Sequence, residues 1–277
     1  MASITTETLR KIENGKVLPT HTTLEILSTH LKTDLNSKLL NYRISDYNLY
    51  LETENEIEFK LDNGDYGYLE NKLEVLDNIL LDIEIDNYIY IRIKQLRLLV
   101  ESILIKINQR DYKKSLSILI DAMKITTPDY ELNSYNEFVY SKMEVRILMN
   151  MALLHNKLDS KITCLNILKF CLRSIGPEEI NCKLKIIYNI SYSCHRLDLH
   201  KKALYYADKG ISTSLEHDSL RFLALLYSRK GMAEFFLNIH KYKYSFKNAF
   251  ILYDIAGQDN LKEILELTLN KYNIILN

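Results

Sequence analysis

The chain has 277 residues, in which 36 Lys and Arg balance 36 Asp and Glu, so its formal net charge is zero. Its 26% charged and 47% apolar residues suit a soluble folded protein, and 7 Gly with 3 Pro are too few for the many turns of an all-β fold. No N-terminal run resembles a signal peptide, and no stretch reaches the apolar length that spans a bilayer. We therefore expect a cytoplasmic protein built from long helices.

The charges are unevenly distributed along the chain. Residues 1–43 carry six basic and four acidic side chains, residues 44–86 carry two and thirteen, and residues 87–277 carry 28 and 19. A mildly basic beginning is thus followed by an acidic segment and a basic remainder. Solvated helix faces account for most of this pattern without any partner.

The first 43 residues predict short helices with defined ends. In the first helix Thr5 is the expected N-cap, and the Asn-Gly pair at 14–15 supplies a left-handed stop. A second helix is expected over 20–31 and a third over 34–41, each with leucines on one face.

This stretch resembles the C-terminal three helices of the helix-turn-helix domain of phage repressors (the Cro/C1 or Xre type). The likeness rests on Thr-Leu-x-x-Ile-Glu-Asn-Gly-Lys-x-x-Pro at 8–19 and Thr-Leu-x-x-Leu-Ser at 23–28. In that family the first of these helices lies in the major groove of DNA. The resemblance therefore implies DNA contacts by Thr5 at the helix start, by Thr6, Glu7 and Thr8 near base edges, and by Arg10, Lys11 and Lys16 near phosphates.

The resemblance is incomplete, because the family has two more helices before this point and the chain begins at Met1 with neither. Those helices supply core and brace the recognition helix, and a short helix without such packing is marginal in water. Two expectations stay open. Either an upstream segment is absent, or residues 1–43 are a helical cap that no longer binds DNA.

From 44 to 277 the chain has the pattern of consecutive amphipathic helices with short polar breaks. Shifting the sequence by 39 residues places Ile-x-x-Asn-x-Ala at 147–152 on Ile-x-x-Asn-x-Ser at 186–191, and Leu-Asp at 158–159 on Leu-Asp at 197–198. A period of this size predicts a solenoid, in which each helix pair buries its apolar side by stacking on the next.

Small residues at Ala203, Ala207 and Gly210 resemble those that let the second helix of a tetratricopeptide repeat approach its neighbours, and similar turns recur at 110–116 and 240–246. We expect an all-α fold, a right-handed α-solenoid of tetratricopeptide-like helix pairs with a partial helix-turn-helix head. The expected pairs lie at about 44–83, 86–126, 130–175, 178–214 and 218–256, with a closing helix at about 259–276.

Such a head followed by about five degenerate pairs resembles the peptide-sensing regulators of Gram-positive bacteria (the Rgg, PlcR and NprR group). In that family a short peptide binds the concave face of the array, where Asn amides clamp its backbone by donating and accepting hydrogen bonds. The resemblance implies that Asn150 and Asn189, at matching repeat positions, form the clamp, with Tyr192 and Arg229 nearby. Alternatively, the asparagines coincide by chance in an Asn-rich chain, and Tyr192 and Arg229 serve packing and solvation.

The chain lacks the motifs of nucleotide-binding, hydrolytic and metal-dependent sites, namely GxGxxG, the P-loop, GxSxG and HExxH. His195 and His200 are five residues apart, a spacing that puts them on different helix faces. The four cysteines have no CxxC spacing and read as reduced core residues of a cytosolic protein, at Cys164, Cys171, Cys182 and Cys194. No catalytic residue, metal site, cofactor or membrane contact is expected.

These features predict a peptide-responsive, DNA-binding transcriptional regulator of the quorum-sensing type, which is not an enzyme. Its expected partners are a short signalling peptide and double-stranded DNA, and a homodimer is expected because such heads usually read pseudo-palindromic sites. The alternative is a tetratricopeptide interaction protein that sequesters a protein partner without binding DNA. The missing helices favour the alternative, whereas the retained Thr6, Thr8, Arg10 and Lys11 favour the regulator.

Overall fold

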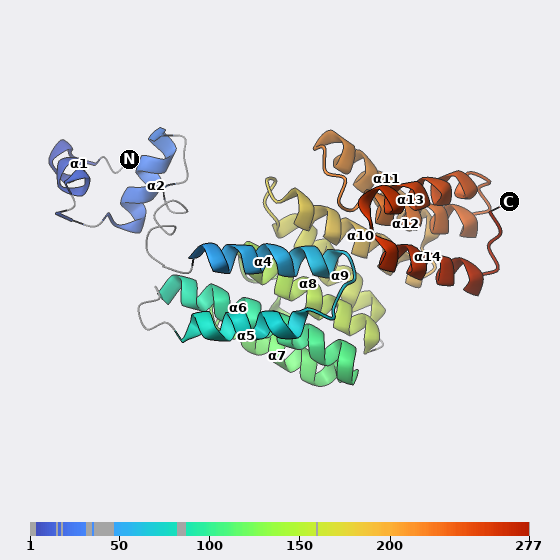
Figure 1. Ribbon diagram of the computed structural model, residues 1–277, viewed down its shortest axis with the longest axis horizontal. Coiled ribbons are helices and arrows are strands. Elements are labelled where there is room, and N and C mark those ends of the chain that lie inside the picture. The colour runs from blue at the N-terminus through green and yellow to red at the C-terminus, as the bar shows by residue number, and fades with distance from the viewer. Residues whose placement is uncertain are drawn as a thin grey trace.

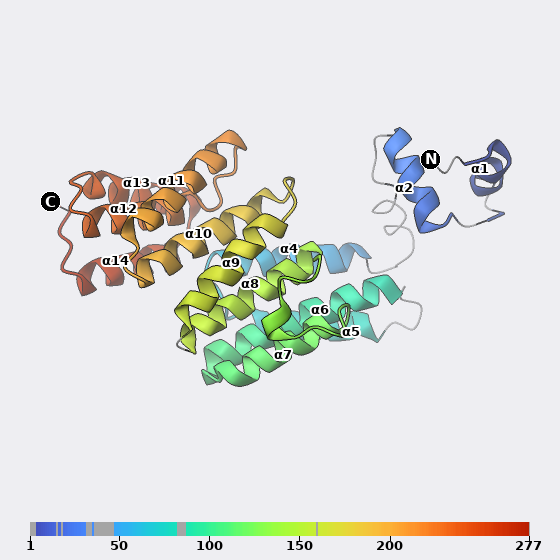
Figure 2. The same ribbon diagram turned by 180° about the vertical axis from the view of Figure 1, so that it is seen from behind.

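The computed structural model describes residues 4–14, 16–17, 19–31, 35, 47–81, 87–158 and 160–276. These residues form helices and turns, and no strand occurs among them. Figures 1 and 2 show a stack of helix pairs, with α1 and α2 at one end and apart from the stack. The expected all-helical solenoid is confirmed. None of the described helices combines the length and apolarity that crossing a bilayer requires.

The described part of the stack consists of five helix pairs and a final helix. The pairs are α4 (Tyr47–Asp62) with α5 (Leu69–Leu80), α6 (Asn87–Leu104) with α7 (Tyr112–Lys124), α8 (Lys142–Lys157) with α9 (Lys161–Ser174), α10 (Ile180–Arg196) with α11 (His200–Glu216), and α12 (Leu223–Phe236) with α13 (Tyr242–Ala256); the final helix is α14 (Asp259–Lys271). All of them lie within the ranges expected from the sequence except α11, which ends two residues beyond the expected 214. Each helix packs mainly on its neighbours in the chain.

The third pair begins later than expected. Residues 130–141 hold a short 3-10 helix, Leu132–Ser134, and irregular turns instead of the start of a long helix. The helix α8 starts only after a capping box, in which the Oγ of Ser141 accepts from the backbone N–H of Glu144 and the Glu144 carboxylate accepts from the N–H of Ser141. The capping signal Ser-x-x-Glu marks this start in the sequence.

The turns within four pairs share one backbone feature. Each contains a residue in the left-handed region: Gly64 with φ 68°, Arg110 with φ 55°, Asp198 with φ 58° and Asn238 with φ 55°. A left-handed residue ends one helix and reverses the chain into the next, as in common helix C-caps. Similar turn sequences therefore recur because each turn needs one residue in the left-handed conformation.

The N-terminal helices α1 (Thr6–Glu13) and α2 (His21–Leu31) match the expected ranges. Thr5 is the N-cap of α1, and its Oγ1 accepts from the backbone N–H of Thr8 at 3.2 Å. No residue of α1 is buried, whereas Leu24 of α2 is 8% exposed. Gly15 and nearly all of the expected third helix lie outside the described residues.

The apolar core along the stack consists of three clusters. Its largest cluster extends from Tyr50 in α4 to Ala203 in α11 and reaches Ala233 in α12, and two smaller clusters follow among the helices from α10 to the C-terminus. All four cysteines are buried and free, as the sequence predicts. Burial raises the pKa of the Cys182 thiol to about 11, which keeps this thiol protonated.

Two glycines allow neighbouring helices to approach closely. A Cβ on Gly210 of α11 would lie 2.5 Å from a methyl group of Leu226 and 3.1 Å from one of Ile187. A Cβ on Gly231 of α12 would lie 2.8 Å from the ring of Phe246, which is fully buried. The expected role of small residues in α11 is thus confirmed at Gly210, and α12 has a similar contact.

We expect the substitution Gly231→Val to lower the free energy of unfolding by about 1–3 kcal/mol, because the added side chain would overlap the fully buried Phe246 ring. Chemical denaturation followed by circular dichroism measures this change. The control is Gly67→Val, since a Cβ at Gly67 meets nothing within 4 Å; its effect should stay within about 0.5 kcal/mol. Equal losses in both variants would show that close packing at Gly231 is not the cause.

Candidate functional site

A cavity of about 190 Å³ lies on the inner side of the stack. The first helices of the pairs (α4, α6, α8, α10 and α12) contribute to its wall, together with α14 and the turn that follows α4. The wall is partly apolar, with Ile103, Leu153 and Leu225, and partly polar, with Asn150 and Asn189 among other side chains. Such a mixed lining can hold apolar side chains and also orient polar groups of a ligand.

Asn150 of α8 and Asn189 of α10 lie in this one cavity, although they are 39 positions apart in the sequence. The Nδ2 of Asn150 donates to the backbone oxygen of Arg146 at 2.9 Å, and the Nδ2 of Asn189 lies 3.7 Å from the sulfur of Met149. Neither Oδ1 accepts a hydrogen bond from the described residues. Both amides therefore retain capacity for a ligand.

Arg229 and Tyr192 lie beside the cavity and are not among the residues that line it. The guanidinium group of Arg229 stacks over two rings of α10, 5.5 Å from the ring centre of Tyr188 and 5.3 Å from that of Tyr192. Of these three residues, only Tyr188 borders the cavity. The Nε of Arg229 is buried and has no hydrogen-bond partner among the described residues.

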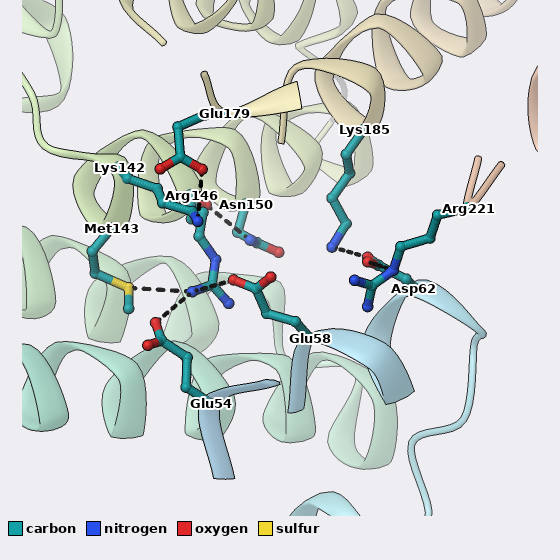
Figure 3. Close-up of polar contacts among 10 residues, drawn as sticks. All are labelled: Glu54, Glu58, Asp62, Lys142, Met143, Arg146, Asn150, Glu179, Lys185 and Arg221. Carbon is teal, nitrogen blue, oxygen red and sulfur yellow. Dashed lines mark hydrogen bonds and ion pairs between the residues drawn. The ribbon is translucent and has the colours of Figure 1, made fainter. Parts of the chain in front are cut away.

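The acidic face of α4 contacts the basic inner side of the stack (Figure 3). Glu54 and Glu58 meet Arg146 of α8, whose Nη1 lies 3.3 Å from Glu54 Oε1 and 2.9 Å from Glu58 Oε1. The side chain of Arg146 is only 7% exposed. Ion pairs with so little access to water are weakly screened by salt.

Asp62, the last residue of α4, pairs with two cations from more distant parts of the chain. One carboxylate oxygen contacts Lys185 of α10, and the other lies 2.8 Å from the Nε of Arg221, just before α12. Figure 3 shows Lys185 and Arg221 converging on Asp62, with Asn150 between Arg146 and Lys185. We call these six residues the α4 ion-pair cluster: Glu54, Glu58, Asp62, Arg146, Lys185 and Arg221.

The turn after α4 extends this contact to the end of the stack. The Nε2 of Gln258, just before α14, donates to the Oδ1 of Asn63 at 2.9 Å. Next to it, a Cβ on Gly64 would lie 3.2 Å from a methyl group of Leu261 in α14. The first helix pair therefore touches the last helix as well as its neighbour in the chain, and the end of α4 forms one wall of the cavity.

Sequence reasoning missed the α4 ion-pair cluster. The expectation of solvated charges is wrong for Glu54, Glu58 and Asp62, whose side chains are 14%, 23% and 5% exposed. Two signals were present in the sequence: the acidic excess of residues 44–86 against a basic remainder, and the spacing of four residues that places the three acids on one helix face.

The charges of the cluster set the ionisation of Glu58. Burial alone would raise the pKa of this carboxyl group, but Arg146, together with Lys142, Lys185 and Arg221, lowers it below the ordinary 4.5. A carboxyl group with a lowered pKa stabilises the fold at pH values above 4.5, and this contribution is lost as pH falls through the lowered value.

We expect Arg146→Met to lower the free energy of unfolding at pH 7 by about 3 kcal/mol, because Glu54 and Glu58 would remain as uncompensated charges. The difference in the free energy of unfolding between this variant and the parent chain should narrow as pH falls through the lowered pKa of Glu58, where this carboxylate takes up a proton. Denaturation curves over a pH series measure both effects. Lys262→Met removes a more exposed ion pair with Asp254 and should lower the free energy of unfolding far less. A similar loss in the two variants would contradict the role assigned to Arg146.

The side chains expected at DNA lie on an exposed helix. Thr6, Glu7, Thr8, Arg10 and Lys11 of α1 and the preceding Thr5 are all exposed, as is Lys16. Lys11 forms an ion pair of 2.8 Å with Glu7, one turn earlier. Such an exposed pair contributes little to stability, so it can exchange readily for a phosphate.

His195 and His200 do not lie apart, and the expectation of separate faces is wrong. The turn at 197–199 reverses the chain, so that His195 at the end of α10 meets His200 at the start of α11, with their Nδ1 atoms 3.1 Å apart. Burial, with Arg229 and His200, lowers the pKa of His195 to about 4, which keeps it neutral at pH 7. No group of three or more potential metal ligands occurs in the described part of the chain.

The fold and the cavity define a solenoid of helix pairs with a polar and apolar pocket on its inner side. Solved structures with this fold include PlcR of Bacillus thuringiensis. Its complex with the peptide PapR7 and DNA gives a TM-score of 0.72 at 17% identity, covering 94% of this chain and 88% of PlcR. Its apo form gives 0.63 at 18% identity, covering 94% and 91%. The expected likeness to the PlcR group is confirmed in the fold.

No protein-family model and no curated protein matches the sequence.

Proposed function

We propose that the chain is a peptide-responsive transcriptional regulator of the quorum-sensing type, which binds a short signalling peptide on the inner side of its solenoid and DNA through α1. The observation that carries this proposal is the meeting of Asn150 and Asn189 in one inner cavity. The likeness to a PlcR structure that holds a peptide and DNA supports it. Its four buried, free cysteines suit the reducing cytoplasm.

An extended peptide suits the cavity chemically. Its backbone presents alternating N–H and C=O groups, and an Asn amide can donate to one and accept from the other. The apolar part of the wall, including Leu153 and Leu225, would take the peptide side chains. The amides then supply the orientation and the apolar wall supplies most of the affinity.

The size of the cavity indicates that peptide binding moves α4. A volume of about 190 Å³ is below that of sites that enclose drug-sized ligands, which begin at about 300 Å³. The end of α4 is the wall held chiefly by ion pairs and therefore the one that polar groups of a ligand can displace. Because α4 is the first helix of the stack and α2 precedes it in the chain, a shift of α4 changes the point at which the N-terminal helices are attached to the stack. This linkage would couple peptide binding to the presentation of α1 in a homodimer.

We expect Asn150→Ala and Asn189→Ala each to weaken peptide binding by about 5- to 30-fold, the equivalent of about 1–2 kcal/mol. A peptide selected from a library of short synthetic peptides with the immobilised chain is the probe, and calorimetry measures its affinity. Asn156→Ala is the matched control, because Asn156 lies on α8 but does not line the cavity. Unchanged affinity in both cavity variants would disprove the clamp.

For DNA binding, we expect a gel shift with the DNA upstream of the chain's own gene, weakening steeply with salt. Arg10→Ala and Lys11→Ala should each weaken binding at all sequences and reduce the salt slope by about one, as the loss of one phosphate contact does. Lys209→Ala removes an exposed charge of α11 and should leave binding unchanged.

The runner-up function is a solenoid that binds a peptide and sequesters a protein partner without contacting DNA. The observation that favours it is that α1 buries none of its residues, so the described residues give this helix little support. Peptide binding together with no gel shift at any salt concentration would select this alternative.

A further inference from the structure

Lys106 lies in the wall of the cavity, on the same inner side as Asn150 and Asn189. It belongs to a π-helical turn, Ile105–Gln109, that continues α6. Such turns are rare and occur frequently at functional sites. The side chain is partly buried, and the residue one turn before it, Ile103, also lines the cavity.

Among the described residues, Lys106 is a cation without an anionic partner. No carboxylate of the described residues forms an ion pair or a hydrogen bond with it, in contrast to Lys185, the other lysine of the cavity, which is paired with Asp62. Among the described residues that line the cavity, Asp62 is the single acidic one. Its second carboxylate oxygen already contacts Arg221. The charge of Lys106 therefore remains uncompensated within the cavity.

The surroundings of Lys106 disfavour its charged form. Burial, together with the charges of Lys157 and Lys185, lowers the pKa of its ammonium group to about 8. At pH 7 most of the group still carries its proton. A partly buried ammonium group without a counter-ion is costly to the fold, and an anion entering the cavity would remove that cost.

We propose that the cavity binds a carboxylate of the peptide, with the ammonium group of Lys106 as its counter-ion and the amide N–H groups of Asn150 and Asn189 as hydrogen-bond donors. One unpaired cation and two neutral donors match a group of single negative charge. The carboxylate is either the C-terminus of the peptide or an Asp or Glu side chain. This inference rests on the proposed peptide binding and names the chemical group that the site selects.

The test selects peptides from two synthetic libraries of short peptides, one with free C-termini and one with amidated C-termini, using the immobilised full chain and mass spectrometry. The variants are Lys106→Met and the control Lys157→Met, which removes an equal but exposed charge nearby. We expect the parent chain and Lys157→Met to enrich carboxylate-bearing peptides, and Lys106→Met to bind the same peptides about 10- to 100-fold more weakly.

The two libraries distinguish the sources of the carboxylate. Enrichment that disappears on amidation identifies the C-terminus, and enrichment of Asp or Glu at a fixed position in both libraries identifies a side chain. Peptides enriched without regard to carboxylates, and bound equally by Lys106→Met, would overturn the inference while leaving peptide binding intact. If the parent chain enriches no peptide from either library, the proposed function itself fails.

A measurement without any ligand tests the unpaired charge. Because the folded chain lowers the pKa of Lys106, its penalty is complete below about pH 8 and disappears as pH rises towards 10.5. Lys106→Met should therefore have a higher Tm than the parent chain at pH 7, and this advantage should shrink between pH 8 and 10.5. A lower Tm at pH 7 would mean that Lys106 is compensated in the free protein, which overturns the inference.

Discussion

The contact between the acidic face of α4 and the cations of the inner helices determines the form of this molecule. In an ordinary solenoid each repeat touches only its neighbours, and the inner face is open. Here Arg146 reaches Glu54 across 92 positions of sequence, and Gln258 reaches Asn63 across 195. These contacts bring the first helix pair against the third, fourth and fifth pairs and against α14, so the inner face becomes a cavity with walls on several sides.

The same contact governs the chemistry of the cavity. Asp62 forms an ion pair with Lys185, whereas no described carboxylate pairs with Lys106 in the same cavity. The charge that the cavity presents therefore depends on which cation α4 reaches. The two asparagines lie among these charges, on α8 and α10. A ligand that contacts the amides is therefore also within the field of an unpaired ammonium group.

The sequence predicts the repeated features well, because they depend on local patterns. The helix ranges follow from apolar periodicity and turn signals, and the matched positions of Asn150 and Asn189 follow from the 39-residue period. Contacts between distant repeats do not follow from a period. The pairing of Glu58 with Arg146, the exposure of Lys106 to the cavity and the approach of His195 to His200 all depend on how the chain returns on itself.

The hydrogen bond between Asn63 and Gln258 ties the two ends of the stack together. A solenoid whose ends do not touch can change its pitch gradually, because small rotations add up from repeat to repeat. Because its two ends are in contact, this stack cannot unwind without breaking the hydrogen bond between Asn63 and Gln258. The curvature of the superhelix and the width of its central space then change together. A ligand that widens this space must also reduce the curvature of the stack.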